Sequence, residues 1–131
     1  MACSTKSVSL GWSLYAAIAT GEVFIPATGW MSATNVTAAK GWGELRGKTG
    51  NFQAKPAVQV ANDVRSPGAS TAVGGFVGGV GGVDGVSDPT GNVAVTAGTS
   101  KYIRAGWLVS LSSGTTLATG SLGGVVELIY G

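Results

Sequence analysis

Few side chains in this chain of 131 residues are suited to catalysis. The sequence has no histidine, which is the usual general base and a common metal ligand of enzymes. Its single cysteine, Cys3, therefore has no histidine to activate it as a nucleophile. A glycosidase-like pair would require two carboxylates to converge in the fold, and their spacing does not indicate this. The carboxylates fall in different predicted elements: Glu22, Glu44, Asp63, Asp84, Asp88 and Glu127. We expect no catalytic residues and no enzyme.

Two short motifs resemble ligand sites but lack essential parts. Gly47–Thr49 matches the end of a phosphate-binding loop, but Trp42 stands where the first glycine is required, and we expect a strand to follow instead of a helix. Asp84 and Asp88 flank a short turn and could both reach a calcium ion. Two carboxylates in a turn more often only form the turn. We expect no metal and no cofactor.

Aromatic side chains at exposed positions are the stronger functional signal. Trp42 and Tyr102 lie on the mixed faces of their predicted strands, and Trp30 lies in a predicted loop. Such rings stack on sugars or anchor protein interfaces, unless a second sheet or a loop covers them. The candidate interface residues are Trp30, Trp42, Arg46, Lys48, Phe76, Val80, Val83 and Tyr102.

Charge is sparse in this sequence. Charged residues make up 11% of the chain, against about 25% in an average domain, so we expect neighbouring molecules to cover much of the surface. The net charge of +2 is too small to indicate a nucleic acid partner. The densest basic group faces either an anionic partner or solvent, and consists of Lys40, Arg46, Lys48 and Lys55. No apolar run approaches about 18 residues, so we expect no membrane-spanning helix.

Strict alternation of apolar residues predicts β-strands near the C-terminus. We expect a strand, a turn and a second strand over 101–130, forming a hairpin, with Trp107 buried between two sheets. The apolar face of the first strand consists of Ile103, Ala105, Trp107, Val109 and Leu111, and that of the second of Leu122, Gly124, Val126, Leu128 and Tyr130.

The rest of the chain carries the same signal in shorter pieces. We expect a strand over 6–18 and a short one over 22–25 that Pro26 ends. Residues 27–40 are predicted to be a loop with a short strand or turn. Further strands are expected over 41–49 and 52–61, joined as a hairpin, then a turn over 62–68 and a short strand over 93–96.

A run of glycine pairs and single valines separates these strands. Val73 to Val86 repeats with a period of about three residues, which fits neither a helix nor a strand. We predict a Gly-rich loop over 73–91, with two interpretations: a surface loop, or a segment that becomes ordered against another subunit.

The predicted fold is a single all-β domain over 1–131. About seven or eight short strands with turn signals between them indicate an antiparallel β-sandwich, like a jelly roll or a Greek key. The alternative is an open barrel. The 23 glycines would also suit a flexible polymer, but the 44% of hydrophobic residues favours a folded core.

The C-terminal segment resembles a known class of virion proteins. Lys101–Val109, Ser112–Thr115 and Val125–Leu128 are similar to the end of small β-sandwich auxiliary capsid proteins of tailed bacteriophages, called decoration or cement proteins. The resemblance covers roughly the last thirty residues, together with the size and the Gly/Ser/Thr-rich composition. It implies a structural protein, often trimeric, that binds the major capsid protein outside an icosahedral shell and clamps neighbouring capsomers.

These expectations place the protein at the capsid surface of the virion, after synthesis in the host cytoplasm, as a homotrimer without nucleic acid or membrane partners. With so few charges, attachment should depend on shape and apolar contacts more than on ion pairs. The alternatives are a carbohydrate-binding or host-receptor-binding module that uses Trp30, Trp42 and Tyr102, or a tail or head-fibre component.

Overall fold

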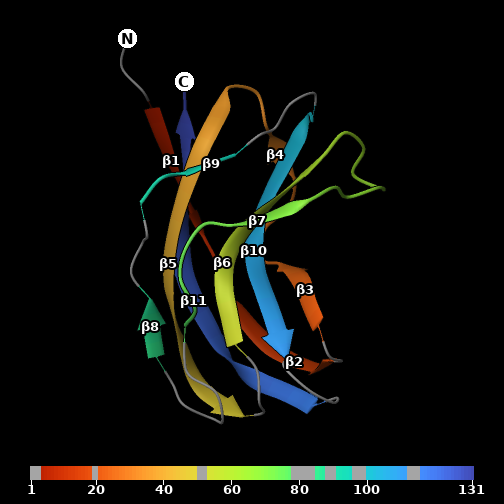
Figure 1. Ribbon diagram of the computed structural model, residues 1–131, viewed down its shortest axis with the longest axis vertical. Helices are drawn as coiled ribbons and strands as arrows, with labels where there is room; N and C mark the ends of the chain where they lie inside the picture. The colour runs from red at the N-terminus through yellow and green to blue at the C-terminus, as the bar shows by residue number, and fades with distance from the viewer. Residues whose placement is uncertain are drawn as a thin grey trace.

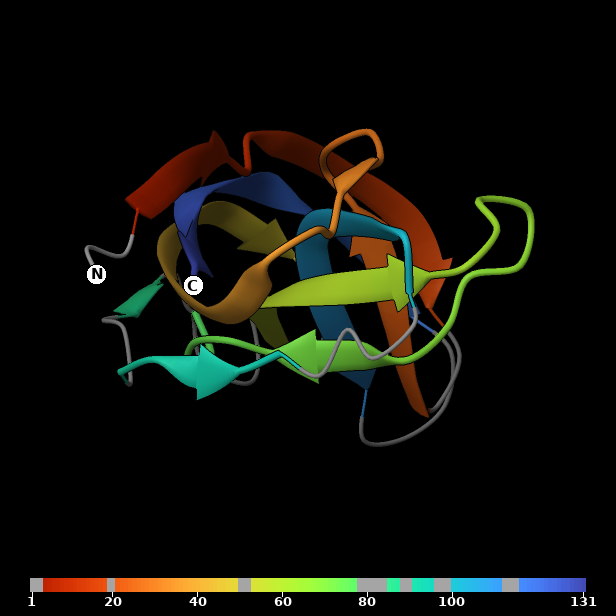
Figure 2. The same ribbon diagram turned by 90° about the horizontal axis from the view of Figure 1, so that it is seen from above.

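Two antiparallel β-sheets pack face to face in the computed structural model, which describes residues 4–18, 21–49, 53–77, 85–87, 91–95, 100–111 and 116–131 (Figures 1 and 2). Sheet A contains β1 (Ser4–Ser9), β2 (Trp12–Ile18), β5 (Val36–Thr49), β8 (Gly85–Ser87), β9 (Val93–Ala94) and β11 (Thr116–Tyr130). Sheet B contains β3 (Gly21–Pro26), β4 (Met31–Ser32), β6 (Gln53–Ala61), β7 (Ser70–Ala72) and β10 (Tyr102–Leu111). No helix in the described residues is long and apolar enough to cross a bilayer.

The order of the strands is that of a jelly roll. β1 and β2 lie end to end beside β11, β3 and β4 lie end to end beside β10, and β8 and β9 lie end to end beside β5. With each of these couples counted as one position, sheet A has the order 1-8-3-6 and sheet B has the order 2-7-4-5. Rolling up four antiparallel pairs, 1 with 8, 2 with 7, 3 with 6 and 4 with 5, produces this arrangement. The predicted antiparallel sandwich is confirmed.

The strand predicted over 6–18 also exists, as two halves in one register. Val8 of β1 pairs with Val126 of β11, and Trp12 of β2 pairs with Leu122 of β11. β1 and β2 therefore continue one line beside β11. Leu10, between the halves, still donates its N–H to the Gly124 carbonyl at 2.9 Å. This line of strand begins beside the end of β11, at the top of Figure 1.

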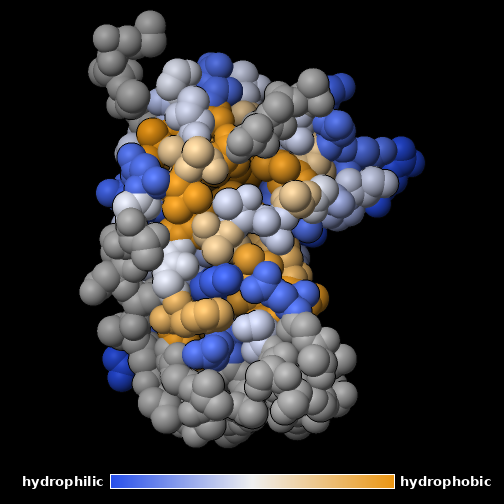
Figure 3. All heavy atoms as spheres, in the orientation of Figure 1, coloured by the Kyte–Doolittle hydropathy of each residue, from blue (hydrophilic) through white to orange (hydrophobic). Residues whose placement is uncertain are grey.

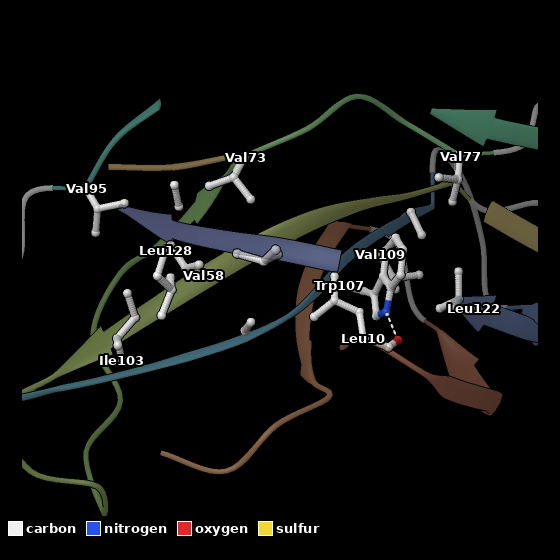
Figure 4. Packing of buried hydrophobic residues seen from close by; sticks show 14 of the residues in the cluster. Leu10, Val58, Val73, Val77, Val95, Ile103, Trp107, Val109, Leu122 and Leu128 are labelled. Atoms are coloured by element: carbon white, nitrogen blue, oxygen red, sulfur yellow. Dashed lines mark hydrogen bonds between the residues drawn. The ribbon is translucent and has the colours of Figure 1, made fainter. Parts of the chain in front are cut away.

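Trp107 fills a notch in the opposite sheet. Gly43 and Gly124 pair with each other on the inner side of sheet A, and a Cβ atom at Gly43 would lie 2.5 Å from the Cη2 atom of Trp107. The indole N–H donates to the carbonyl of Leu10 at 3.1 Å (Figure 4). Trp107 is fully buried, which confirms its predicted place between the sheets. Gly43 therefore makes room for the largest side chain of the core.

Val73 joins the two sheets along one side of the sandwich. Its N–H donates to the Pro56 carbonyl of sheet B at 2.9 Å, and its own carbonyl accepts from the Gly41 N–H of sheet A at 2.8 Å. The approach is close, because a Cβ atom at Gly74 would clash with the Gly41 carbonyl oxygen. The junction between the sheets therefore requires glycine at positions 41 and 74, where a Cβ atom would be too close to its neighbours.

The structure describes residues 73–77, 85–87 and 91 of the predicted loop over 73–91, and neither longer piece is a plain surface loop, because 85–87 is strand β8 and 73–77 lines the core. Val73 and Val77 are fully buried, and the Val77 N–H donates to the Ala54 carbonyl at 2.7 Å. Among the five residues, Phe76 alone has an exposed side chain. Gly74 allows close backbone contact between the sheets, and Val73 and Val77 on either side of it fill the core.

Both predicted hairpins are wrong. β5 and β6 are consecutive, but β5 pairs with β11 in sheet A and β6 pairs with β10 in sheet B. β10 and β11 likewise belong to different sheets, so 101–130 is an arch that crosses the core. Alternation identifies the inward face of a strand but not its partner, and strands of two facing sheets have the same pattern as hairpin partners. The turns at 50–52 and 112–115 lie outside the described residues.

One strand boundary differs as well. β4 is a short strand of the kind expected within 27–40, but β5 begins at Val36, before the strand predicted over 41–49. Val36 and Ala39 are buried, so small residues supply core positions that the low apolar content of this segment concealed.

Candidate functional site

The outward-facing side chains divide between two surfaces. The outer face of sheet A is defined here by Lys40, Trp42, Glu44, Arg46, Gly123 and Glu127, which share one side of β5 and β11. The outer face of sheet B is defined by Phe24, Trp30, Lys55, Gln59, Tyr102 and Arg104, from β3, β6, β10 and the loop before β4. Both surfaces are available to a partner, and they differ in chemistry.

Arg104 is the centre of the outer face of sheet B. Its guanidinium carbon lies 4.3 Å from the centre of the Trp30 ring and 5.6 Å from the centre of the Phe24 ring. Its Nε–H donates to Oε1 of Gln59, the residue directly opposite on β6, at 2.9 Å. Burial lowers the pKa of the Arg104 guanidinium, because the charged form loses solvation. Two rings and an amide therefore hold a partly buried cation.

A second cation lies further along the same face. Lys55 forms an ion pair with Glu22 at 3.5 Å, across β10, and its Nζ lies 4.9 Å from the centre of the Phe76 ring. Leu108, outward-facing on β10 between these strands, is only 5% exposed. Phe76 is 42% exposed, so an aromatic ring remains accessible beside this covered leucine.

The outer face of sheet A has its charges paired within the sheet. Lys40 and Glu127 lie opposite each other on β5 and β11, 4.0 Å apart. Arg46 donates two hydrogen bonds to Glu44, at 3.1 and 3.3 Å. Trp42 lies between these pairs and is half-buried. This face therefore has rows of small residues, one indole ring and no net charge among these four ions.

A hydrophilic loop over 62–69 projects from the sandwich between β6 and β7 (Figures 1 and 3). Arg65 donates to Asp63 at 3.0 and 3.2 Å and is otherwise exposed. The Arg65 side chain, and then its backbone N–H, lower the pKa of Asp63, and this carboxylate raises the pKa of Arg65. The two ends of this ion pair thus satisfy each other in solvent.

The structure distributes the predicted interface residues over both surfaces. Trp42 and Arg46 face outward from sheet A, whereas Trp30, Tyr102 and Phe76 lie on the side of sheet B. Tyr102 is 37% exposed and Trp30 is half-buried. Lys48 is at the end of β5, where side chains lie outside the described part, as do Val80 and Val83.

The predicted basic group does not form one patch. Lys40 and Arg46 extend from sheet A, Lys55 extends from sheet B, and each has a carboxylate from its own sheet within 4.0 Å. Within the residues described by the structure, no cluster of three metal-ligating side chains is present.

Sequence reasoning missed Arg104, Phe24 and Gln59. One signal was available: Tyr102 and Arg104 alternate on the mixed face of a strand whose other face is wholly apolar. The rings that hold Arg104 come from separate segments, and only the pairing of β3 and β6 with β10 brings them together.

No family model matches the chain, and no curated protein matches it in sequence. Solved structures do share its fold. A chain in the structure of the infectious bursal disease virus Gx strain superposes with a TM-score of 0.64 and 13% identity, covering 99% of this chain and 32% of that chain. A chain of the Gt strain has a TM-score of 0.59 at 13% identity, covering 96% of this chain and 33% of that one.

The VP2 subviral particle of the same virus contains another similar chain, with a TM-score of 0.52, 12% identity and coverages of 97% and 36%. The chain therefore spans about a third of the length of each of these three chains. At these identities the likeness establishes the shared β-sandwich fold.

Proposed function

We propose that this chain is a structural virion protein that binds the outside of an icosahedral phage capsid and stabilises contacts between capsomers. The observation that carries the proposal is that nearly the whole chain, 99% of it, superposes on one third of a chain from a virus particle. The resemblance of its C-terminal segment to decoration proteins supports the same role independently.

The partners in this proposal are the major capsid protein and further copies of this chain, as a homotrimer at the capsid surface. The outer face of sheet A suits contact with a neighbouring copy in the trimer, because its four ions pair within the face and leave no net charge to repel that copy. The outer face of sheet B then faces the capsid, with Phe76 as an apolar contact. Repetition over many copies makes such attachment strong by avidity.

The test uses particles produced without this protein. Adding the purified chain should saturate a fixed number of sites, raise the temperature at which the particles release their contents, and give density over capsomer junctions in a reconstructed map. Purified protein that binds no particle, or that binds with unchanged particle stability, would contradict the proposal. Density on a tail or a fibre would assign the protein to that structure instead.

The variant Phe76→Glu tests whether Phe76 makes a specific apolar contact with the capsid. The ring is exposed and lies beside Lys55, which can pair with the new carboxylate, so the fold should tolerate the change. Val64→Glu is the matched control, because Val64 is 44% exposed on the projecting loop. We expect Phe76→Glu alone to weaken particle binding. Deleting 74–85 would be a poorer test, since it also removes the buried Val77.

The carbohydrate-binding alternative predicts a different result. One face of the Trp30 ring is occupied by Arg104, which leaves Tyr102 as the exposed ring near it. Reproducible binding on a glycan array that is lost with Tyr102→Ala, together with no binding to particles, would favour that function.

A further inference from the structure

Arg104 has the geometry of a recognition residue more than of a structural ion. Its guanidinium is fixed on one side by the Trp30 ring, on another by the Phe24 ring, and at Nε by Gln59. These two cation–π contacts and the bond to Gln59 restrain the side chain, so less rotamer freedom remains to be lost when a ligand binds. A guanidinium held in this way presents its outer N–H groups in a defined direction.

The donors of this group exceed the acceptors around it. A guanidinium has five N–H donors, and in the described residues only the Nε–H has an acceptor, the amide oxygen of Gln59. No carboxylate in the described part of the chain lies within ion-pair distance of Arg104. Burial at the same time lowers the pKa of the group. A partly desolvated cation without a counter-ion is stabilised when a carboxylate arrives.

The other ions of the structure make this situation unusual. Each Asp or Glu side chain that the structure describes already pairs with a cation of this chain, in the pairs Glu22 with Lys55, Glu44 with Arg46, Asp63 with Arg65 and Glu127 with Lys40. A second copy of the described surface therefore has no spare carboxylate for Arg104. Among the described residues, the charge balance therefore favours a carboxylate from a different protein; Asp84 and Asp88 lie outside these residues.

We propose that Arg104, stacked between Phe24 and Trp30, binds an exposed Asp or Glu side chain of a different protein. The inference deepens the proposed function, on which it rests for the identity of that protein, the capsid subunit beneath. The planar fork of the guanidinium matches a carboxylate with two parallel hydrogen bonds. Tyr102, two residues away on the same outer face, adds an exposed ring at the rim of the contact. Because the rings shield the contact, salt should weaken it only in part.

The first experiment needs no particle. The protein is titrated with the capped peptide acetyl-Gly-Glu-Gly-amide and, separately, with its Gln counterpart, while NMR follows the Arg104 Nε–H and Trp30 indole N–H signals. We expect saturable shifts with a dissociation constant on the order of millimolar for the Glu peptide. The Gln peptide should bind with an affinity at least about 10-fold lower.

Variants decide whether the guanidinium itself is responsible. Arg104→Gln and Arg104→Lys should each lower peptide affinity by about 10-fold, since lysine keeps the charge but lacks the planar fork. Arg65→Gln is the matched control, because it removes one positive charge from an exposed pair and should leave the peptide affinity unchanged. Melting temperatures establish that each variant is folded. A lysine variant that binds as tightly as the original chain would overturn the proposal.

The second experiment measures binding to particles that lack this protein, before and after their exposed carboxylates are converted to amides with carbodiimide and glycinamide. We expect amidation and Arg104→Gln each to reduce binding about 10-fold or more. Particle binding unaffected by both treatments would overturn this inference and leave the proposed function intact. Glu-peptide binding without particle binding would support the carboxylate site and contradict the proposed function. Binding through Arg104 to sialylated glycans but not to the Glu peptide would overturn the protein source of the carboxylate.

Discussion

The outer faces of the two sheets differ in how their charges are balanced. On sheet A, Lys40 and Glu127 face each other across two strands, and Glu44 and Arg46 lie on one strand. On sheet B, Lys55 has a carboxylate partner, whereas Arg104 has two aromatic rings and an amide. A face whose charges cancel suits contact with copies of itself, and a face with a spare cation suits an acidic partner.

The difference between the faces does not extend to the interior, which both sheets share. Ile103 and Val109 from sheet B and Leu45 and Leu128 from sheet A are all fully buried in one core. Changes in the core should therefore affect both faces equally, whereas changes on a face should affect one kind of binding and leave stability unaltered.

Removing the Trp107 ring should have the largest effect. Trp107→Ala empties the notch at Gly43 and removes the hydrogen bond to Leu10, so we expect a loss of about 3–5 kcal/mol in the free energy of unfolding. Chemical denaturation measures this, with Trp107→Phe as the milder variant. An unchanged unfolding midpoint for Trp107→Ala would mean that Trp107 does not pack in the core shared by the two sheets.

A long side chain on the outer face of sheet A should prevent self-association. Gly123 has open space around it, and Glu44 lies opposite, so Gly123→Lys should leave the monomer folded. Burying the new lysine in the interface between copies should raise the dissociation constant of self-association about 100-fold. Gly75→Lys is the control, because Gly75 is equally open but lies outside this face. Sedimentation in which both variants associate as the original chain does would assign self-association to another surface.

Two neighbouring glycines of sheet A should respond differently to one added methyl group. Gly43→Ala places a Cβ atom 2.5 Å from the Trp107 ring and 2.6 Å from a backbone oxygen, which should cost about 1–3 kcal/mol of stability. Gly123→Ala adds the same group on the outer side, where nothing lies within 4 Å, and should change stability by about 0.5 kcal/mol or less. Equal melting temperatures would show that the notch adjusts freely.

The smallest effect is expected at the projecting loop. Because Arg65 lowers the pKa of Asp63, the pair contributes to stability above the ordinary aspartate pKa and loses that contribution as the pH falls through the lowered value, below about pH 4. Arg65→Gln should return the Asp63 pKa, measured by NMR, towards its ordinary value. Near neutral pH the melting temperature should change little, as for other exposed pairs. If Asp63 titrates identically in both proteins, Arg65 and Asp63 do not interact, and Arg65 is then no example of a paired cation to compare with Arg104.

The sequence by itself determined that the fold is built from β-strands, and it determined the inward face of the main strands. Alternation over 102–111 and 122–130 is enough to orient Trp107, Val126 and Leu128 inward, because successive side chains of a strand point to opposite sides. It was also enough to place Trp42 and Tyr102 outward. These are local properties of consecutive residues, so no partner strand is needed to infer them.

Only the tertiary structure decided which strands pair and which side chains meet. The arches between β5 and β6 and between β10 and β11 have the alternation of hairpins, because inward faces look alike whether strands lie side by side or across a core. The site around Arg104 depends on that choice. Phe24, Gln59 and Arg104 become neighbours because β3 and β6 both pair with β10, and long-range pairing of this kind leaves no local mark in the sequence.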